Sequence, residues 1–376
     1  MASVLLTGIS NQAHANTDSE PTNSEPTDTT PVVGLGAGDG QSWALLSDGK
    51  IKGWGEPYCD AIGCLAPTEI APLDLGTAAV EVQSNGEYTI ARLDDGSVFT
   101  WSTNAEGIST PEPMTLLYPS AVAQLAMGEG FMCMRFEDGA VQCEGLGGNP
   151  APASISSAML DGAATELMAG AAHACALLDT GAVQCWGSND SGQLGSPSAV
   201  DTNILSLSGP ATQIVAGGDH SCALLETGDV QCWGRNTEGQ LGHPQASVGT
   251  VPLDEPAARI TAGAEHSCAI TALTQSLYCW GNDDLQQLGT GEDVAGLRRV
   301  DLGSHAAVEI FAGPTAWTTF AVLDDGKLYG WGNDDVGQLG YGNVFSWDVT
   351  TRSSEGIPDV IIYDGIDGDG DVNNDD

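Results

Sequence analysis

Residues 214–242, IVAGGDHSCALLETGDVQCWGRNTEGQLG, contain the unit from which this chain is built. The stretch divides into a short apolar run, a second run CALL, a turn ETG, a third run VQCW and a glycine-rich return NTEGQLG. Apolar runs separated by such turns are typical of strands that fold back on one another. The stretch therefore predicts an antiparallel meander.

Copies of this unit recur along the chain. Three further copies are plain, at 167–195, 260–289 and 310–340. Weaker copies begin at Val33, Val82 and Leu125, which makes seven in all. The period of roughly 42 to 51 residues indicates one closed array of repeats rather than two ordinary domains.

The repeat resembles that of the regulator of chromosome condensation family. The family pattern, A-G-x-x-H-[ST]-x-A-L followed by D-G-x-V-[YC]-x-W-G-x-N-x-x-G-Q-L-G, stands almost letter for letter at 216–242. The resemblance covers residues 32–363 and implies an all-β fold, a seven-bladed β-propeller with about four antiparallel strands per blade. The match is strong in blades four to seven, partial in blade one and weak in blades two and three. Blades two and three lack GQLG, and Glu144 replaces the repeat tryptophan of blade three.

Each blade is expected to end in a more variable outer strand. Candidate stretches are IAPLDL at 70–75, ILSLSG at 204–209 and VPLDE at 251–255.

The two ends of the chain lie outside the repeats. Residues 1–15 end in Ala-His-Ala, as at an export cleavage site, but the apolar segment is short and no basic residue precedes it. They are interpreted as a signal remnant or, alternatively, as an unstructured tail. Residues 16–31 predict a disordered acidic stalk and residues 364–376 a disordered acidic tail.

The balance of charge limits the possible partners. The chain of 376 residues has 51 acidic and only 10 basic residues, a formal net charge of −41. Such a surface repels a phosphate backbone, so nucleic acid is not expected as a partner. No apolar run reaches the roughly 18 residues of a membrane span, so no transmembrane segment is predicted.

Ten cysteines form five close pairs: Cys59 with Cys64, Cys133 with Cys143, Cys175 with Cys185, Cys222 with Cys232, and Cys268 with Cys279. A three-residue hairpin loop with a left-handed glycine would set Cys175 opposite Cys185. Facing residues have Cα atoms about 4.5 to 5.5 Å apart, within disulfide range. The last pair contains one more residue, so its loop should be longer. We expect disulfides, with metal binding as the alternative, and infer an extracytoplasmic location: secreted, periplasmic or at the cell surface.

Blades without cysteines support this register. The two slots hold Trp43 and Gly53, Ile90 and Thr100, or Phe320 and Gly330. A large residue would then cover a small one, which fills the volume that a disulfide fills elsewhere.

Two other residue types recur at one position per repeat and are interpreted as structural. The tryptophans Trp54, Trp101, Trp186, Trp233, Trp280 and Trp331 are expected to pack between blades, with an aromatic ligand cage as the alternative. The histidines His173, His220 and His266 each stand two residues before a cysteine. Catalysis by these histidines is the alternative to blade packing.

No catalytic motif and no cofactor site is predicted. The acid pairs Asp283 with Asp284 and Asp334 with Asp335 lie in turns before the glycine-rich return, where such residues serve turn geometry. In the tail, Asp367, Asp369 and Asp371 are spaced like the start of a calcium loop. That loop lacks its glycine and its final glutamate, so calcium remains only an alternative to a disordered tail.

The favoured function is a noncatalytic, extracytoplasmic binding or scaffold propeller that recognises a protein or a glycan. Blades two and three lose their GQLG returns, either by drift of tolerant loops or by selection for binding. Under selection the binding residues are placed there, as exposed side chains: Glu106, Glu112, Tyr118, Phe131 and Glu144. The resemblance implies an alternative, guanine-nucleotide exchange on a small GTPase. A third hypothesis is a hydrolase that uses rim carboxylates, and a fourth, within the first, is a secreted enzyme inhibitor.

Overall fold

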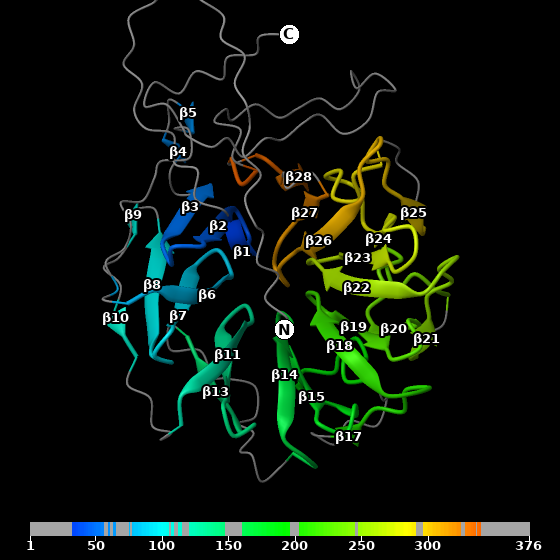
Figure 1. Cartoon of the computed structure of the whole chain (residues 1–376), viewed down its shortest axis with the longest axis horizontal. Coiled ribbons are helices and arrows are strands. Elements are labelled where there is room, and N and C mark those ends of the chain that lie inside the picture. The colour runs from blue at the N-terminus through cyan, green and yellow to red at the C-terminus, as the bar shows by residue number, and fades with distance from the viewer. Residues whose placement is uncertain are drawn as a thin grey trace, which may run out of the picture.

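The protein is a seven-bladed, all-β propeller. The computed structural model describes residues 32–55, 59–60, 63–64, 75, 77–104, 107–108, 112–114, 120–146, 160–195, 203–244, 247–290, 296–324, 328–335 and 337–339. Figure 1 shows the blades arranged around a central axis, with the first strand of each blade innermost. Within these residues every regular element is a strand, and no helix could span a membrane. The expectations for residues 1–31 and 364–376 lie outside the described residues.

Blades one to three come from the first part of the chain. Blade one contains β1 (Val32–Gly38), β2 (Gln41–Leu46) and β3 (Ile51–Gly55), and the short β4 (Cys59–Asp60) and β5 (Gly63–Cys64) form a separate pair. Blade two contains β6 (Ala79–Ser84), β7 (Tyr88–Leu93), β8 (Val98–Asn104), β9 (Gly107–Ile108) and β10 (Glu112–Pro113). Blade three contains β11 (Val122–Met127), β12 (Phe131–Phe136) and β13 (Val141–Gly145).

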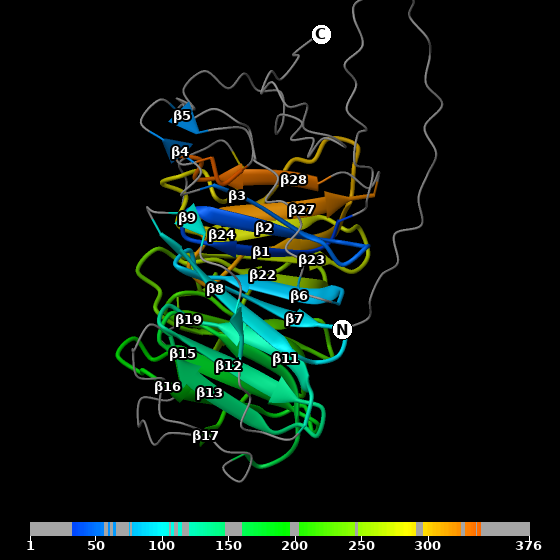
Figure 2. The ribbon, with the colours of Figure 1, turned by 90° about the vertical axis from the view of Figure 1, so that its left-hand side faces the viewer.

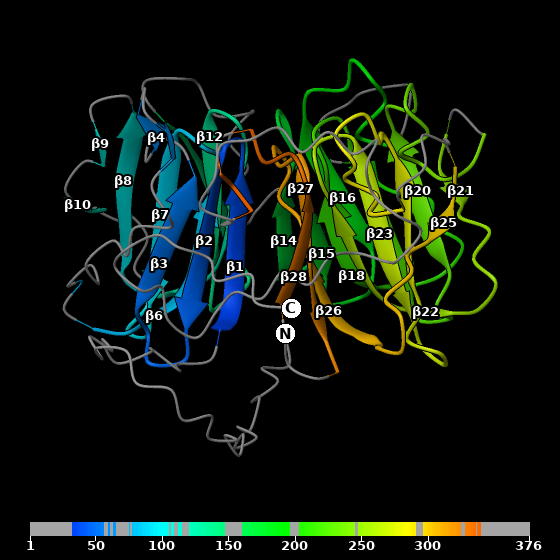
Figure 3. The same cartoon turned by 90° about the horizontal axis from the view of Figure 1, so that it is seen from above.

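Blades four to seven follow in the same antiparallel order, seen from two further directions in Figures 2 and 3. Blade four is β14 (Ala164–Ala169), β15 (His173–Leu178), β16 (Val183–Gly187) and β17 (Asn203–Ile204). Blade five is β18 (Ala211–Ala216), β19 (His220–Leu225), β20 (Val230–Gly234) and β21 (Gly249–Thr250). Blade six is β22 (Ala257–Ala262), β23 (His266–Thr271), β24 (Leu277–Gly281) and β25 (Arg298–Arg299). Blade seven is β26 (Ala307–Phe311), β27 (Thr318–Leu323) and β28 (Leu328–Gly332).

The outer strands differ from the prediction. Of the stretch 204–209 only Ile204 lies in a strand, and the strand near 251–255 comes earlier, at Gly249–Thr250. The Val251 amide makes one more bond, to the Val230 carbonyl, and the next residue is Pro252, which has no amide hydrogen to continue the ladder. The stretch 70–75 lies outside the described residues apart from Leu75.

Four hairpin disulfides join the second and third strands of blades three to six. They are Cys133–Cys143, Cys175–Cys185, Cys222–Cys232 and Cys268–Cys279, with Cα–Cα distances of 4.0 to 4.1 Å. The predicted facing register is confirmed, although these Cα atoms are closer than the expected 4.5 to 5.5 Å. The longer loop of blade six is also confirmed. Cys59 and Cys64 face each other across β4 and β5, and their side chains lie outside the described part of the structure.

Blades one and seven, which lack hairpin cysteines, fill the same space with rings, whereas blade two sets Ile90 opposite Thr100. Trp43 lies opposite Gly53 and Phe320 opposite Gly330. A Cβ atom added at Gly53 would lie 2.6 Å from the Trp43 ring, and one added at Gly330 would lie 2.7 Å from the Phe320 ring. The expectation that a large residue covers a small one is therefore confirmed, and glycine is required by the close approach of the ring.

A register shift occurs near the start of each inner strand, and in blades three and five the residue that follows it is a glutamine that reaches the next blade. Directly after the shift, Gln124 accepts a hydrogen bond from the Leu167 amide and donates one to the Leu167 carbonyl. Gln213 does the same with Ile260, at 3.0 Å in both bonds. Neighbouring inner strands, which lack a shared sheet, are therefore joined by side-chain amides.

Candidate functional site

The predicted binding residues do not share one environment. Glu112 is exposed in β10, and Glu144 is partly buried in β13, where its Oε1 accepts a hydrogen bond of 2.7 Å from Gln142 Nε2. Glu106 and Tyr118 lie outside the described residues. Phe131 is only 3% exposed, so the expectation that it is an exposed side chain is wrong.

Phe131 is buried because it occupies the histidine position of blade three. Like His173, His220 and His266, it stands at the start of the second strand, two residues before the first cysteine. Its ring lies against Gly128, as the histidine rings lie against Gly170, Gly217 and Gly263. It also belongs to the same apolar cluster as Ala174 of blade four. The ring is therefore part of the junction between blades three and four.

The three histidines form a row of contacts between successive blades. The Nε2 atom of His173 lies 2.7 Å from Ser221 Oγ. That of His220 lies 2.8 Å from Ser267 Oγ, and that of His266 lies 2.7 Å from Thr319 Oγ1. All three rings are 0% exposed. The prediction that these histidines serve blade packing agrees with this geometry.

The hydroxyl groups determine which nitrogen of two of the rings carries the hydrogen. Ser267 donates its hydroxyl hydrogen to the Gln240 carbonyl at 3.2 Å, and Thr319 donates to the Gln287 carbonyl at 2.9 Å. Each hydroxyl has one hydrogen, so His220 and His266 donate from Nε2. The Nδ1 atoms of all three rings are buried and have no hydrogen-bond partner within the described residues. Burial lowers the pKa of His173 and His266 to about 4 and that of His220 to about 3.

A serine beside a histidine resembles a catalytic pair, but these pairs lack the other parts of one. A nucleophile must reach its substrate, and its histidine is usually oriented by a third group that accepts from Nδ1. Here Ser221 and Ser267 are 1% and 0% exposed. The geometry supports a structural role, in which neutral imidazoles bridge the blades.

The repeat tryptophans make a second connection between blades. In four blades the indole Nε1 donates a hydrogen bond to a glutamine backbone carbonyl. Three of these bonds are 2.9 Å long: Trp233 to Gln193, Trp280 to Gln240 and Trp331 to Gln287. The fourth, from Trp54 to Gln338, is 2.8 Å long. In each case the glutamine belongs to the GQLG return of the preceding blade, which reads QQLG in blade six. We call this bond the Trp–Gln clasp. Packing of the tryptophans between blades is thus confirmed, and GQLG has a role that the sequence analysis missed.

The Trp–Gln clasp changes at blades two and three. Glu144 occupies the tryptophan position of blade three, next to the blade that has lost GQLG. In blade four the tryptophan is kept, but Trp186 Nε1 is buried with no partner within the described residues. The same holds for Trp101 Nε1 in blade two. The sequence signal was available, since the tryptophan of blade three and the GQLG of blade two are lost together.

The rim carboxylates proposed for a hydrolase hold the loops in shape. Asp283 Oδ1 accepts from the Leu288 amide at 2.9 Å, and Asp334 Oδ1 accepts from the Leu339 amide at 2.8 Å. Burial, reinforced by the neighbouring Asp335, raises the pKa of Asp334 to about 7. No group of three potential metal-ligating side chains lies within the part of the chain that the structure describes. The calcium candidates Asp367, Asp369 and Asp371 lie outside that part.

Comparison with known proteins identifies the repeats. The family model described as regulator of chromosome condensation (RCC1) repeat matches residues 168–193, 211–240, 258–287 and 308–338, and a second model of the same description matches 227–270. The E3 ubiquitin-protein ligase HERC2 of Homo sapiens is 36% identical over 77 residues, which are 19% of this chain and 2% of that protein. This chain therefore corresponds to only a small part of that relative.

Solved structures share the fold over a larger part of the chain. Prp20p from Saccharomyces cerevisiae, in a structure described together with its binding to Gsp1p and histones, has a TM-score of 0.63 at 19% identity, and the match covers 82% of this chain and 84% of that chain. Human WBSCR16 has a TM-score of 0.63 at 16% identity, with 73% of this chain and 81% of that chain covered. At these identities the likeness shows the fold alone. This chain is a seven-bladed β-propeller in which residues 168–338 contain regulator of chromosome condensation repeats.

Proposed function

We propose that this chain is a noncatalytic, extracytoplasmic binding propeller that recognises a protein or a glycan through the rim of blades two and three. In this proposal the propeller of residues 32–363 is the binding unit. The observation that carries the proposal is the change in the Trp–Gln clasp. Junctions from blade four round to blade one keep the clasp, whereas Glu144 replaces its tryptophan at blade three.

Three properties support this reading over an enzyme or an exchange factor. The recurring histidines and serines are buried and bonded across blade junctions. The net charge of −41 disfavours attachment to nucleic acid. Four hairpin disulfides suit an oxidising compartment rather than the location of a small GTPase.

The candidate contact residues within the described part of the rim are Glu112 and Glu144, together with Glu106 and Tyr118 outside it. Carboxylates suit a basic protein surface or hydroxyl groups of a sugar. Phe131 is withdrawn as an exposed contact residue because its ring is buried.

The test uses the folded protein with the returns 104–114 and 144–153 either intact or rewritten to the GQLG type. Binding is measured on a glycan array and on a panel of purified basic extracellular proteins, with Asp190→Asn in blade four as the matched control. We expect binding that the rewriting abolishes and the control preserves. Nucleotide exchange on a small GTPase, or salt-sensitive binding to duplex DNA, would contradict the proposal.

A further inference from the structure

The hairpin of blade six departs from every other described hairpin of this type. In blades one to five the loop between the second and third strands ends in a glycine with positive φ: Gly49, Gly96, Gly139, Gly181 and Gly228. In blade six the equivalent residue is Gln275, which has φ of 53°. Its carbonyl still accepts the bond that Gly181 and Gly228 accept, from the first amide of the next inner strand. A left-handed conformation is unfavourable for a residue other than glycine, so the surrounding structure must hold it.

Glu255 of the preceding segment holds this loop. Its Oε2 accepts from the amides of Leu273 and Thr274 at 3.2 and 3.1 Å, and its Oε1 accepts from Thr274 Oγ1 at 2.7 Å. The hydroxyl of Thr274 also lies 2.8 Å from Ser276 Oγ. The hydrogen bond from the Thr274 hydroxyl lowers the pKa of the Glu255 carboxyl, and this effect outweighs burial, which raises it. The carboxyl group of Glu255 therefore stays ionised. The loop is therefore ordered before any partner arrives.

The ordered loop presents an apolar side chain to solvent. Leu273 is 79% exposed, the most exposed of the large hydrophobic residues in the described part of the chain. A fixed and exposed leucine loses little conformational freedom on binding, which is the property of an interface anchor.

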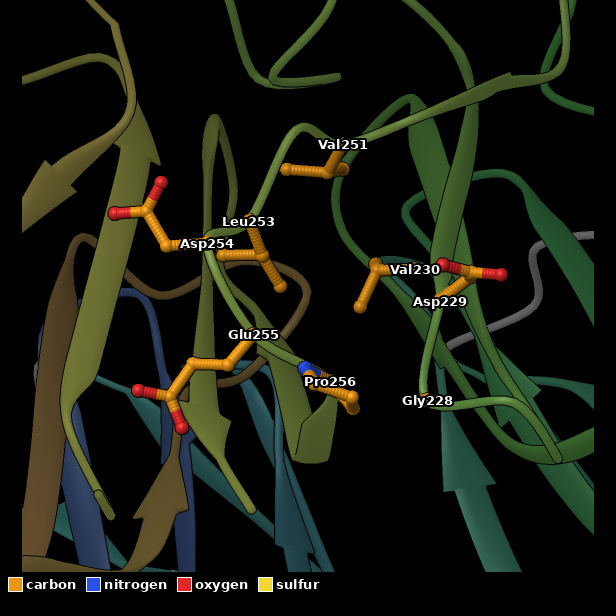
Figure 4. A pocket seen from close by; sticks show the side chains of 8 residues that line it. All are labelled: Gly228, Asp229, Val230, Val251, Leu253, Asp254, Glu255 and Pro256. Carbon is orange, nitrogen blue, oxygen red and sulfur yellow. The ribbon is translucent and has the colours of Figure 1, made fainter. Parts of the chain in front are cut away.

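Glu255 also lines a recess. Its volume is about 190 Å³, and its lining includes Val230, Val251 and Leu253. Figure 4 shows Asp254 and Glu255 on one side of these apolar side chains and Asp229 on the other. Asp229 and Asp254 are exposed. Val230 and Val251 are buried, so the half-buried Leu253 is the apolar side chain of the recess that a partner can touch. A leucine flanked by carboxylates fits a side chain with an aliphatic stem and a positive head.

We propose that Leu273 and this recess form one docking surface, here called the blade-six anchor, for a protein segment that carries a lysine or arginine beside an apolar pocket. The basic side chain lies over Leu253, within the negative field of Asp229 and Asp254, and Leu273 enters the apolar pocket of the partner. The inference rests on the proposed binding function, but it uses a different surface from the rim of blades two and three.

The test selects a phage-displayed random peptide library on the full chain and measures the affinity of the synthesised peptides by calorimetry. We expect the selected peptides to combine basic and apolar residues. Their affinity should fall at least about tenfold with Leu273→Ser, and with Asp229→Asn combined with Asp254→Asn. Rewriting residues 272–275 as the Asp-Thr-Gly loop of blade four should have the same effect. Circular dichroism confirms that each variant is folded.

Two controls separate this surface from others. Ile204→Ser removes another exposed apolar side chain, 47% exposed, and Asp179→Asn removes an exposed hairpin charge. Both should change affinity less than about twofold. Peptides that bind Leu273→Ser as tightly as the unaltered chain, or the absence of any enriched peptide, would overturn the blade-six anchor. Peptides that lose affinity only with Glu112→Gln and Glu144→Gln would overturn it while supporting the proposed rim.

Discussion

Trp54 of blade one donates its indole hydrogen to the backbone carbonyl of Gln338 in blade seven, across 284 positions of sequence. The same carbonyl accepts the hydroxyl of Ser42 at 2.8 Å. These two bonds connect the first blade to the last, because no described strand of one blade pairs with a strand of the other. The ring is thus closed without strand pairing, by these two bonds and by the apolar cluster in which Trp54 lies edge-on to Phe320.

Removal of the Trp–Gln clasp should destabilise the propeller. Its contribution is the difference in unfolding free energy between two tryptophan-to-phenylalanine variants, one with the clasp in the original chain and one without it. Trp233→Phe deletes an indole that donates at 2.9 Å, whereas Trp186→Phe deletes one with no partner within the described residues. Both lose similar volume. We expect Trp233→Phe to lose about 1 kcal/mol more in free energy of unfolding, measured by urea denaturation. Equal losses would show that the clasp contributes nothing.

The buried histidines should make the protein sensitive to acid. Their folded pKa values, about 3 to 4, lie below the value of about 6.5 in an unfolded chain. Their contribution is therefore present above about pH 6.5 and is lost as pH falls toward 4. His220→Gln can still donate to Ser267 and does not titrate. The difference in unfolding free energy between the original chain and this variant should shrink as pH falls, and a constant difference would contradict the prediction.

Glu166 should make the protein less stable as pH rises, the opposite of the effect of the histidines. It accepts from the Ile214 amide at 3.0 Å, and burial raises its pKa to about 7. A raised pKa means that its contribution is fully present below about pH 4.5 and is lost as pH rises through 7. Glu166→Gln copies Gln213, whose amide also donates to the neighbouring carbonyl. We expect this variant to be more stable at pH 8 by on the order of 1 to 3 kcal/mol and unchanged near pH 4. Lower stability at pH 8 would rule this out.

Each hairpin disulfide should add about 2 to 3 kcal/mol of stability, because it closes a loop of about ten residues in the unfolded chain. Replacing Cys222 and Cys232 with alanine removes both the bond and the volume. Replacing them with phenylalanine and glycine, as at Phe320 and Gly330, removes only the bond. The second variant should melt between the first variant and the original chain. Peptide mapping without reduction should recover the four described bridges.

Salt should raise the melting temperature. The excess of 41 negative charges repels itself, and the Debye length falls from about 10 Å at 0.1 M to about 3 Å at 1 M. Melting followed by circular dichroism in sodium chloride and in potassium chloride would check this, and a flat or falling curve in both salts would oppose it.

The sequence was sufficient for features that depend on local spacing. A three-residue hairpin loop set Cys175 opposite Cys185, and the same count set Trp43 opposite Gly53, as the structure confirms. Features that depend on the next blade were missed, because their partners stand some 40 or more positions away. The Trp–Gln clasp joins residues 40 to 284 positions apart, and Gln124 reaches Leu167 across 43.

Phe131 shows a different kind of error. Its spacing from Cys133 matches that of His173 from Cys175, so its place at the blade junction was readable. The prediction instead followed the divergence of the neighbouring loop. The exposure of Leu273 had its own signal, a hairpin without glycine, but the three bonds to Glu255 depend on how the segment before β22 packs against this hairpin, 18 to 19 positions along the chain.

The row of blade junctions also restricts how such a chain can be rearranged. Blades four, five and six each present a histidine to a serine or threonine of the next blade, whereas blade three presents Phe131 to Ala174. A duplicated copy of blade five would fit beside the original, because blade five offers a serine to the preceding blade and a histidine to the following one. A copy of blade three inserted there would place a benzyl group against a hydroxyl and leave a histidine-accepting serine unmatched. Growth or shuffling of this array by recombination is therefore confined to blades whose two edges are interchangeable, and the order of the remaining blades is held by their mismatched neighbours.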